Sequence, residues 1–506
     1  MWLRGGYGDP PRKRAGTRPS ERHAAAPAAR RSSERRPSID AQRSEPVGAS
    51  APVRHLSLAD ATAVVVGIVV GAGIFRSPAL VAMNTSGPAA MVAAWVLGGL
   101  LCLCGALAYT ELAAAYPAVG GEYVYLTRAF GRGVGFLFVW ARTTVIQTGS
   151  IAALAYIFGD YVARLIPSGP AGPMLWALAA AVILTACNVL GLRTGRWTQN
   201  LLTAAKVVGV CAIAAAGLLC AGPAAVEPEA AAGAAAVADG TAGSGPGAAA
   251  FGLAMVFVLY TFGGWNEAAY VAGELRNPRR NTLRLLVGSI LLLTVLHVAI
   301  NLAYLRVLGF EGVRGSSAVA ADAMSRLLGR GGSAAVVCLV AVSALGAMNG
   351  CIFTGARAVC ALGGDFAVLG PLGRWHGRLG TPAAAILLQS SVAVVLILLP
   401  GLGEGFRKAL GSGFEAAVEY TAPVFWAFLL MTGAAVFVLR VRDPGAERPF
   451  RVPLAPLTVG LFCLMCGWML YSSLAYTRAG ALVGVGVLAV GAVAYLALGR
   501  RPTGPA

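Results

Sequence analysis

The chain has 506 residues, of which 57% are hydrophobic and 12% charged, with a mean hydropathy of +0.71 and a net charge of +18. Soluble globular domains carry about 25% charged residues, so this composition excludes an ordinary soluble protein. We predict an all-α protein that crosses a lipid bilayer several times. Because the positive charge is concentrated in short segments between apolar runs, we expect no nucleic-acid partner.

Residues 1–55 differ from the rest of the chain. They are rich in Arg, Ser, Pro and Ala, contain 12 Lys and Arg against 5 Asp and Glu, and have no sustained apolar run. A segment with little hydrophobicity and high net charge cannot bury a core, so we predict a disordered basic cytoplasmic tail. Its arginine and serine content also resembles that of an organellar transit peptide, which is the weaker interpretation.

Apolar segments of membrane-spanning length follow the tail. A helix rises 1.5 Å per residue, so roughly 20 apolar residues cross a hydrocarbon core of about 30 Å. On this criterion the sequence predicts 12 transmembrane helices, at 58–80, 88–109, 133–162, 173–191, 199–221, 249–272, 284–305, 333–356, 381–400, 418–439, 453–474 and 479–498.

The basic residues are distributed unevenly between the loops. If the N-terminus is cytoplasmic, the tail and the cytoplasmic loops hold 29 of the 40 Lys and Arg residues, and the outer loops hold 8. Cytoplasmic loops of membrane proteins carry an excess of Lys and Arg. We therefore expect a multi-pass protein of the cell membrane with both termini in the cytoplasm.

Glycines interrupt two of these segments at corresponding positions in two halves of the chain. The interruptions read GAGIF at 71–75, in the first segment, and FGGWN at 262–266, in the sixth. At membrane depth, irregular backbone is tolerated only where it is packed in protein or lines a cavity. Broken helices in corresponding positions of two repeats point to a substrate site near the bilayer midplane.

The spacing of the two breaks also predicts the domain organisation. Five segments make up each unit, and an odd number inserts the second unit upside down relative to the first. We predict a 5+5 inverted repeat with broken helices 1 and 6, plus two peripheral helices. The transport core starts with residues 56–400, its repeats cover about 58–221 and about 249–439, and peripheral helices 11 and 12 cover 453–498.

Several further motifs follow one another along the chain. They are IVVGAGIFRSP at 68–78, GGEYVYL at 120–126, YTFGGWN at 260–266, GELRNP at 273–278 and RPFRVP at 448–453. Together they resemble the amino acid-polyamine-organocation (APC) superfamily, near the L-type amino acid transporters and their bacterial relatives. The resemblance covers residues 58 to about 475 and implies a transporter.

The two breaks suit the charged groups of an amino acid. The first frees N–H groups at the start of a half-helix, where the partial positive charge favours a carboxylate. The second exposes carbonyls that accept hydrogen bonds from an α-ammonium group. The alternative is that these glycines only allow close helix packing. By resemblance, the substrate-binding residues are Val70, Gly71, Ala72, Gly73, Ile74, Tyr260, Phe262 and Gly263.

Tyr260 and Lys206 take specific roles in this resemblance. Tyr260 aligns with an aromatic that the family uses as a lid over bound substrate, whereas packing against lipid is the alternative. In sodium-independent members, a lysine at the place of Lys206 is thought to replace the sodium ion that relatives bind against helices 1 and 8. The alternative is that Lys206 snorkels to the cytoplasm.

Three other charged residues lie in or at the ends of predicted spans. Glu267 is a candidate for proton or substrate coupling, because an intramembrane carboxylate is by default functional, unless it faces water. Two interpretations explain Arg142 equally well: it lines an inner vestibule, or its side chain snorkels to the membrane interface. Glu111 is expected to pair with a loop arginine, Arg276 or Arg280.

These features predict a secondary transporter that moves amino acids by alternating access, without sodium, as a proton-coupled carrier or an exchanger. The alternatives are a non-transporting sensor of the same fold or a polyamine or organocation transporter. The four histidines lack any metal-ligand spacing, so we expect no enzyme, cofactor or metal. Partner-linked members of the family use a cysteine in the loop at 163–172, which has none here, so we expect no covalently linked accessory subunit.

Overall fold

The computed structural model describes residues 56–71, 73–219, 248–399, 414–477 and 479–499. By its internal contacts the chain divides into Met1–Glu45 and Pro46–Ala506, and every described residue belongs to the second unit. The predicted tail, residues 1–55, lies outside the described residues, as does Ala72.

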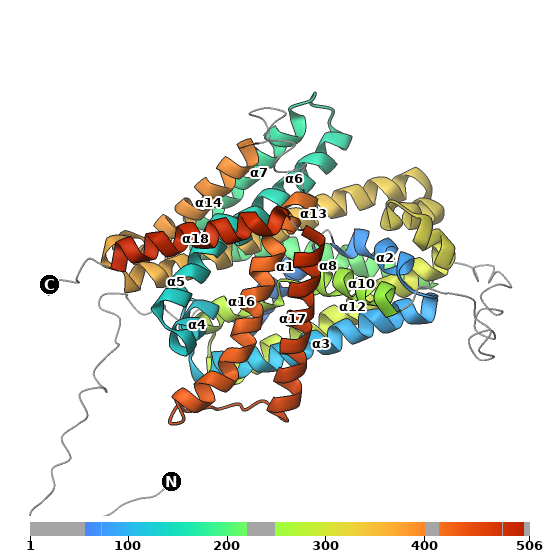
Figure 1. Ribbon diagram of the computed structural model, residues 1–506. Helices are drawn as coiled ribbons and strands as arrows, with labels where there is room; N and C mark the ends of the chain where they lie inside the picture. Colours follow the sequence, from blue (N-terminus) through green and yellow to red (C-terminus); the bar gives the residue numbers. More distant parts are fainter. Residues whose placement is uncertain (1–55, 72, 220–247, 400–413, 478, 500–506) are drawn as a thin grey trace, which may run out of the picture. The chain divides into compact units, whose positions relative to one another are not determined.

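The described part of the chain is helical, and its extended pairing consists of two isolated β-bridges (Figure 1). The α-helices are α1 (Leu58–Val69), α2 (Gly73–Met83), α3 (Pro88–Ala115), α4 (Glu122–Phe130), α5 (Arg132–Ala141), α6 (Gln147–Leu165), α7 (Gly172–Val189), α8 (Leu192–Leu219), α10 (Ala248–Phe262), α11 (Ala268–Val271), α12 (Pro278–Gly315), α13 (Val319–Asp365), α14 (Ala383–Leu398), α16 (Phe414–Arg442), α17 (Ala455–Thr477) and α18 (Ala479–Gly499). Shorter elements are the π-helix η2 (Arg142–Ile146) and the 3-10 helices η3 (Trp265–Glu267), η4 (Ala272–Glu274) and η5 (Ala367–Gly373).

Within the described residues, eight helical segments are long and apolar enough to cross a bilayer, namely α3, α5 to α6, α7, α8, α12, α13, α16 and α17. The bent pair α1 and α2 makes a ninth if it is counted as one span, while α14 and Gly484–Leu498 are shorter apolar helices. The protein is therefore an all-helical, multi-pass membrane protein. The number 12 and the inverted repeat stay predictions.

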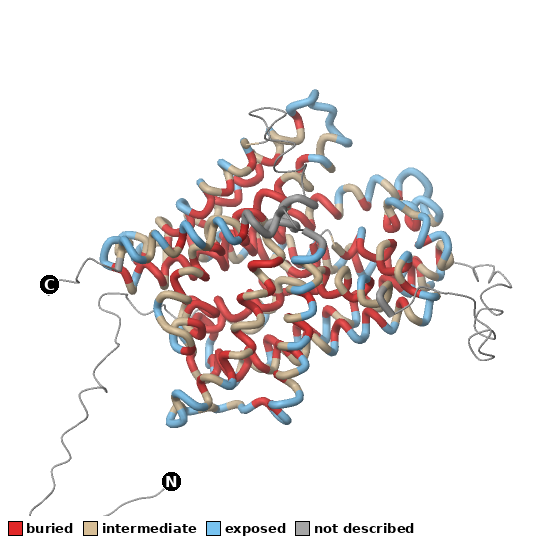
Figure 2. The backbone as a smooth tube through the Cα atoms, in the orientation of Figure 1, coloured by how far each residue is buried: buried red, intermediate tan, exposed pale blue. Residues whose placement is uncertain are grey.

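The burial of the helices fits a lipid environment. In α13, 72% of an 18-residue apolar window is buried, against 28% in α17, so α13 is central and α17 largely outward-facing. Figure 2 shows this contrast between buried and exposed helix faces. Large apolar side chains such as Ile183 and Leu201 are more than half exposed, which water disfavours and lipid tails allow.

The first helix break has local causes. Ser57 and Asp60 form a capping box that starts α1: the Asp60 amide donates to Ser57 Oγ at 3.1 Å and the Ser57 amide donates to Asp60 Oδ2 at 3.2 Å. The helix ends at Val69, and α2 resumes at Gly73 with a bend of 49° between the two. The bend leaves the end of one half-helix and the start of another inside the bundle.

The second break follows α10, where η3, α11 and η4 replace a continuous helix. Gly264 has a φ of 104°, a left-handed conformation that side chains rarely adopt. A Cβ atom there would also lie 2.7 Å from Cγ2 of Ile68 on α1. A glycine is therefore needed at 264 for the two breaks to meet.

Candidate substrate-binding site

A cavity of about 180 Å³ lies where the two breaks meet. Gly71 and Gly73 line it from the first break, and Gly263 and Gly264 from the second. Side chains of η2, α6, α13 and α16 complete the wall. The cavity is smaller than the roughly 300–1,000 Å³ of sites for drug-sized ligands, so it suits a small metabolite.

The first break presents the start of a helix to this cavity. Because α2 begins at Gly73, its first N–H groups have no acceptor within the helix and carry the positive end of its dipole. A Cβ atom on Gly73 would lie 3.2 Å from Cγ2 of Thr261, so the two half-helices approach closely here. Val70 and Ile74 are fully buried and do not line the cavity.

The second break contributes Tyr260 and Gly263 to the cavity wall, as well as Thr261. Phe262 is fully buried and points elsewhere: its ring stacks on the His297 imidazole at 4.6 Å between centroids, and the other neighbour of that imidazole is Trp95. His297 is thus a packing residue, with Nδ1 close to the Leu293 carbonyl at 2.7 Å.

Tyr260 leads to a specific prediction. If its ring closes over bound substrate, Tyr260→Ala removes the occluding side chain while leaving the helices intact, and we expect transport per folded molecule to fall about tenfold or more. The measurement is uptake normalised to folded protein in proteoliposomes. The matched control is Tyr471→Ala, because Tyr471 is 65% exposed on α17. Equal uptake by the two variants would mean that Tyr260 serves packing only.

Lys206 lies in α8 and is fully buried, so its ammonium does not reach the protein surface, as snorkelling would require. Its Nζ donates to three backbone carbonyls: Gly67 O at 2.5 Å, Val70 O at 3.0 Å and Ser343 O at 3.0 Å. An ammonium has three donors, and all three are used. The structure thus joins α8, the end of α1 and α13 through one cation.

Glu267 and Arg142 form an ion pair in the cavity wall. Arg142 Nη2 donates to both carboxylate oxygens of Glu267, at 2.7 and 2.6 Å, and both residues are buried. The guanidinium also lies 4.1 Å above the ring of Tyr270, a cation–π contact. Snorkelling of Arg142 is therefore wrong, and Glu267 has a fixed partner. Opposite charges in two predicted spans could have indicated this pair, because intramembrane charges usually pair with each other.

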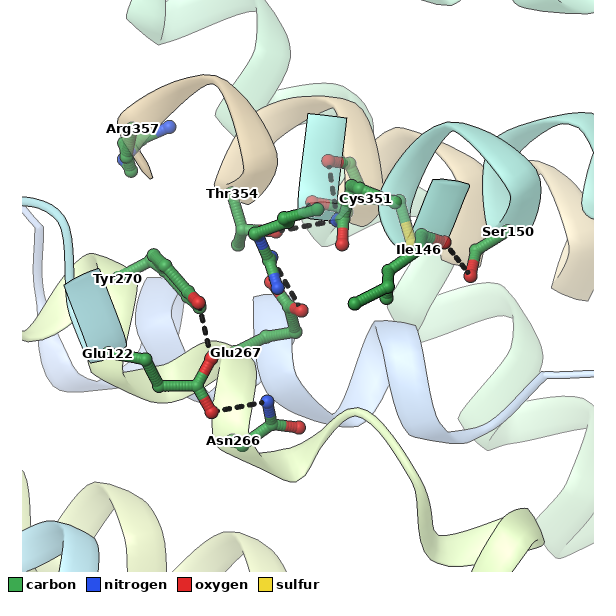
Figure 3. Close-up of polar contacts among 12 residues, drawn as sticks. Glu122, Ile146, Ser150, Asn266, Glu267, Tyr270, Cys351, Thr354 and Arg357 are labelled. Atoms are coloured by element: carbon green, nitrogen blue, oxygen red, sulfur yellow. Dashed lines mark hydrogen bonds and ion pairs between the residues drawn. The ribbon is translucent and has the colours of Figure 1, made fainter. Parts of the chain in front are cut away.

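Glu122, at the start of α4, lies next to this pair and was not predicted. Its carboxylate accepts hydrogen bonds from the Tyr109 and Tyr270 hydroxyls and from Asn266 Nδ2, the last at 3.1 Å. Figure 3 shows Tyr270 and Asn266 pointing at this carboxylate. Because Tyr270 contacts both Glu122 and Arg142, the tyrosine links α4 to the cavity wall.

Two further ion pairs join segments that are distant in the sequence. Arg357 of α13 pairs with Glu274 of η4, and both are buried. Glu111 accepts from Arg440 Nε at 2.8 Å and from Nη2 at 2.6 Å, so the expected pairing with Arg276 or Arg280 is wrong. The end of α3 and the end of α16 meet although more than 300 residues separate them in the sequence. No local sequence pattern predicts such a contact.

The described residues hold no group of three His, Cys, Asp or Glu side chains placed to bind a metal ion. Within that part of the chain, the chemistry of the cavity thus rests on backbone groups, the Arg142–Glu267 pair and neutral side chains.

Comparison with known proteins supports a common origin with amino acid transporters. A family model described as amino acid permease matches residues 56–489. The chain is 33% identical over 416 residues to the mouse b(0,+)-type amino acid transporter 1, covering 81% of each chain. It is 27% identical over 410 residues to the serine/threonine exchanger SteT of Bacillus subtilis, covering 80% of this chain and 87% of SteT. It is 29% identical over 455 residues to the rabbit large neutral amino acids transporter small subunit 2, covering 88% of this chain and 81% of that protein.

Proposed function

Since this chain belongs to the amino acid permease family, we propose that it moves amino acids across the membrane by alternating access. The family comprises transporters rather than enzymes, so the protein is a permease and not a catalyst. Beyond this, we propose the substrate class, the ion coupling and the pathway of the substrate through the protein.

One observation carries the proposal: a small cavity lies between both helix breaks. The N–H groups that start α2 suit a carboxylate, and the carbonyls freed at the second break suit an ammonium. Gly71, Gly73 and Gly263 bring backbone to the cavity without filling it with side chains. Val70, Ile74 and Phe262 belong to the backbone segments that hold this arrangement, and Ala72, which we also assign to the proposed site, lies outside the described residues.

The contacts of Lys206 support sodium-independent transport. Gly67 and Val70 lie at the end of α1, whose last carbonyls have no intrahelical donors and carry the negative end of the dipole. A cation is favourable there, and the ammonium already occupies the place with all three donors used. We propose that Lys206 takes over the structural role that a sodium ion would have.

The test is flux in proteoliposomes that contain the purified protein. We expect uptake of labelled amino acids at a rate unchanged when choline replaces sodium. Exchange predicts faster uptake when the vesicles are preloaded with unlabelled amino acid, and proton coupling predicts loss of accumulation with a protonophore. A protein that binds amino acids but gives no flux under any of these gradients would be a sensor, which would overturn the proposal.

The topology is part of the proposal. We infer 12 spans with both termini in the cytoplasm of a cell-membrane protein, from the 29-to-8 distribution of basic residues. On a cysteine-free background, an impermeant maleimide applied from outside should label a cysteine introduced at Asp239 and not one at Arg378. Asp239 lies outside the described residues and Arg378 precedes α14. The reverse labelling pattern would refute this orientation.

We also propose that no accessory subunit is attached through a disulfide at the loop between α6 and α7, because residues 166–171 between them contain no cysteine.

A further inference from the structure

We propose that the Arg142–Glu267 pair sets the charge selectivity of the cavity, so that the protein accepts amino acids with uncharged side chains and rejects cationic and anionic ones. This inference rests on the proposed function, because it concerns the substrate class of the same cavity. The names of the relatives do not decide it, since they include a b(0,+)-type amino acid transporter, a serine/threonine exchanger and a large neutral amino acids transporter.

The pair contributes all of the side-chain charge in the described cavity wall. The other described residues around the cavity are glycines, apolar or aromatic side chains, and neutral polar groups such as Gln147, Ser150 and Thr261. Arg142 comes from the π-helix η2, and Glu267 from the 3-10 helix η3 after the second break. Single-turn π-helices within α-helices are frequent at functional sites, where they re-aim a side chain.

The geometry of the pair cancels its charge. One nitrogen, Arg142 Nη2, lies within 2.7 Å of both oxygens of Glu267, and the two side chains are 3% and 7% exposed. At this depth little water screens either charge. Each charge is therefore neutralised mainly by the other, and a bound substrate meets a wall of zero net charge.

Selectivity follows from the cost of burying a third charge. A lysine or arginine side chain entering the cavity would have to compete with Arg142 for Glu267 while being repelled by Arg142. A glutamate side chain would have to compete with Glu267 for Arg142 while being repelled by Glu267. Either way one charge is left buried without a full partner, which is strongly unfavourable. An uncharged side chain leaves the pair intact.

Glu122 does not alter this selectivity directly. It does not line the cavity, and its two oxygens are occupied by donors from Tyr109, Tyr270 and Asn266. It does lie close enough to share Tyr270 with Arg142. If Glu267 is neutralised, the remaining charge of Arg142 is therefore partly balanced by Glu122, whereas loss of Arg142 leaves Glu267 uncompensated. The two single variants should differ in the size of their effects.

The experiment compares wild type, Arg142→Gln, Glu267→Gln and the double variant. Binding of leucine, serine, lysine and glutamate is measured by ligand-induced thermal stabilisation of purified protein, because a ligand that binds only the folded state raises its stability. Ratios between ligands within one variant do not depend on the amount of protein. We expect wild type to prefer leucine or serine over both charged amino acids.

In Arg142→Gln the affinity for lysine relative to leucine should rise about tenfold or more, which corresponds to about 1.4 kcal/mol. In Glu267→Gln the relative affinity for glutamate should rise by a smaller factor. The double variant carries no unpaired charge at these two positions and should regain the wild-type ratios.

Three results would overturn the inference. The first is wild type that binds lysine or glutamate as tightly as leucine and serine, a result that needs no variant to fold. The second is an equal loss of all ligands in Glu267→Gln, which would mean that Glu267 holds the α-ammonium group. The third is folded variants with unchanged ratios, which would make the pair structural only. Absence of flux with normal binding ratios would instead refute the transport function and leave the selectivity inference standing.

Discussion

Lys206→Ala is expected to abolish transport at normal protein abundance. The substitution removes the cation that joins α8 to α1 and α13, and leaves the carbonyls of Gly67 and Val70 at the end of α1 without this donor, whereas the Ser343 carbonyl lies within the helix α13. A buried group that loses its partner costs about 1–3 kcal/mol. Two of the three carbonyls belong to the end of α1 next to the cavity, so the first break should lose its defined position.

Lys206→Arg separates this role from a general need for positive charge. A guanidinium is planar and presents its donors in a fixed fork, so it cannot direct three donors at carbonyls arranged around one nitrogen. We expect transport to fall more than about tenfold in Lys206→Arg as well. A misplaced guanidinium at the first helix break raises the free-energy barrier between the conformational states of the transporter.

The matched control for both variants is Thr203→Ala, one turn earlier in α8. Thr203 Oγ1 donates to Ala63 O at 2.8 Å, so this variant removes a hydrogen bond between α8 and α1 but no charge. Thr203 Oγ1 also accepts a hydrogen bond from Gln199 Nε2 at 3.2 Å, but that amide also donates to Ala63 O at 3.5 Å and so keeps a partner in the variant. Uptake in Thr203→Ala should therefore remain within about threefold of wild type, as expected for the loss of neutral hydrogen bonds. Uptake is measured in sodium and in choline. Sodium-dependent uptake by the wild type would refute the substitution of Lys206 for sodium, whatever the variants do.

Gly73→Leu is expected to reduce uptake to background while the protein still inserts into the membrane. Even a Cβ atom at this position lies 3.2 Å from Thr261, and a leucine side chain would have to enter the cavity or push the second break away. Either result blocks the N–H groups at the start of α2 from a carboxylate. Gly73→Ala needs a shift of only a few tenths of an ångström and should retain part of the activity.

Two measurements check the prediction for Gly73. The control Gly288→Leu adds the same side chain to a span where a Cβ atom meets nothing within 4 Å, and should transport normally. In the wild type, an amino acid amide should compete poorly with the acid, because it lacks the charge that the start of α2 favours. Full uptake by Gly73→Leu would exclude this segment as the substrate site.

The sequence alone determined the features that depend on local chemistry. Apolar runs of spanning length predicted the helices, because backbone groups in lipid must be satisfied within one segment. The glycine-interrupted stretches at 71–75 and 262–266 predicted both breaks, since glycine allows backbone conformations that other residues resist. The family was recognisable from the order of its motifs, and the family model that matches 56–489 confirms it.

Only the tertiary structure decided which charges meet. Arg142 and Glu267 are 125 residues apart in the sequence, Arg357 and Glu274 are 83 apart, and Arg440 and Glu111 are 329 apart. A long side chain such as arginine pairs with a carboxylate that the packing of the helices brings within hydrogen-bond distance. No local sequence pattern shows which carboxylate that is. The cavity has the same origin: its glycines were visible in the sequence, but the neutralised pair in its wall exists only because the fold brings the Arg142 side chain of η2 within hydrogen-bond distance of Glu267 of η3.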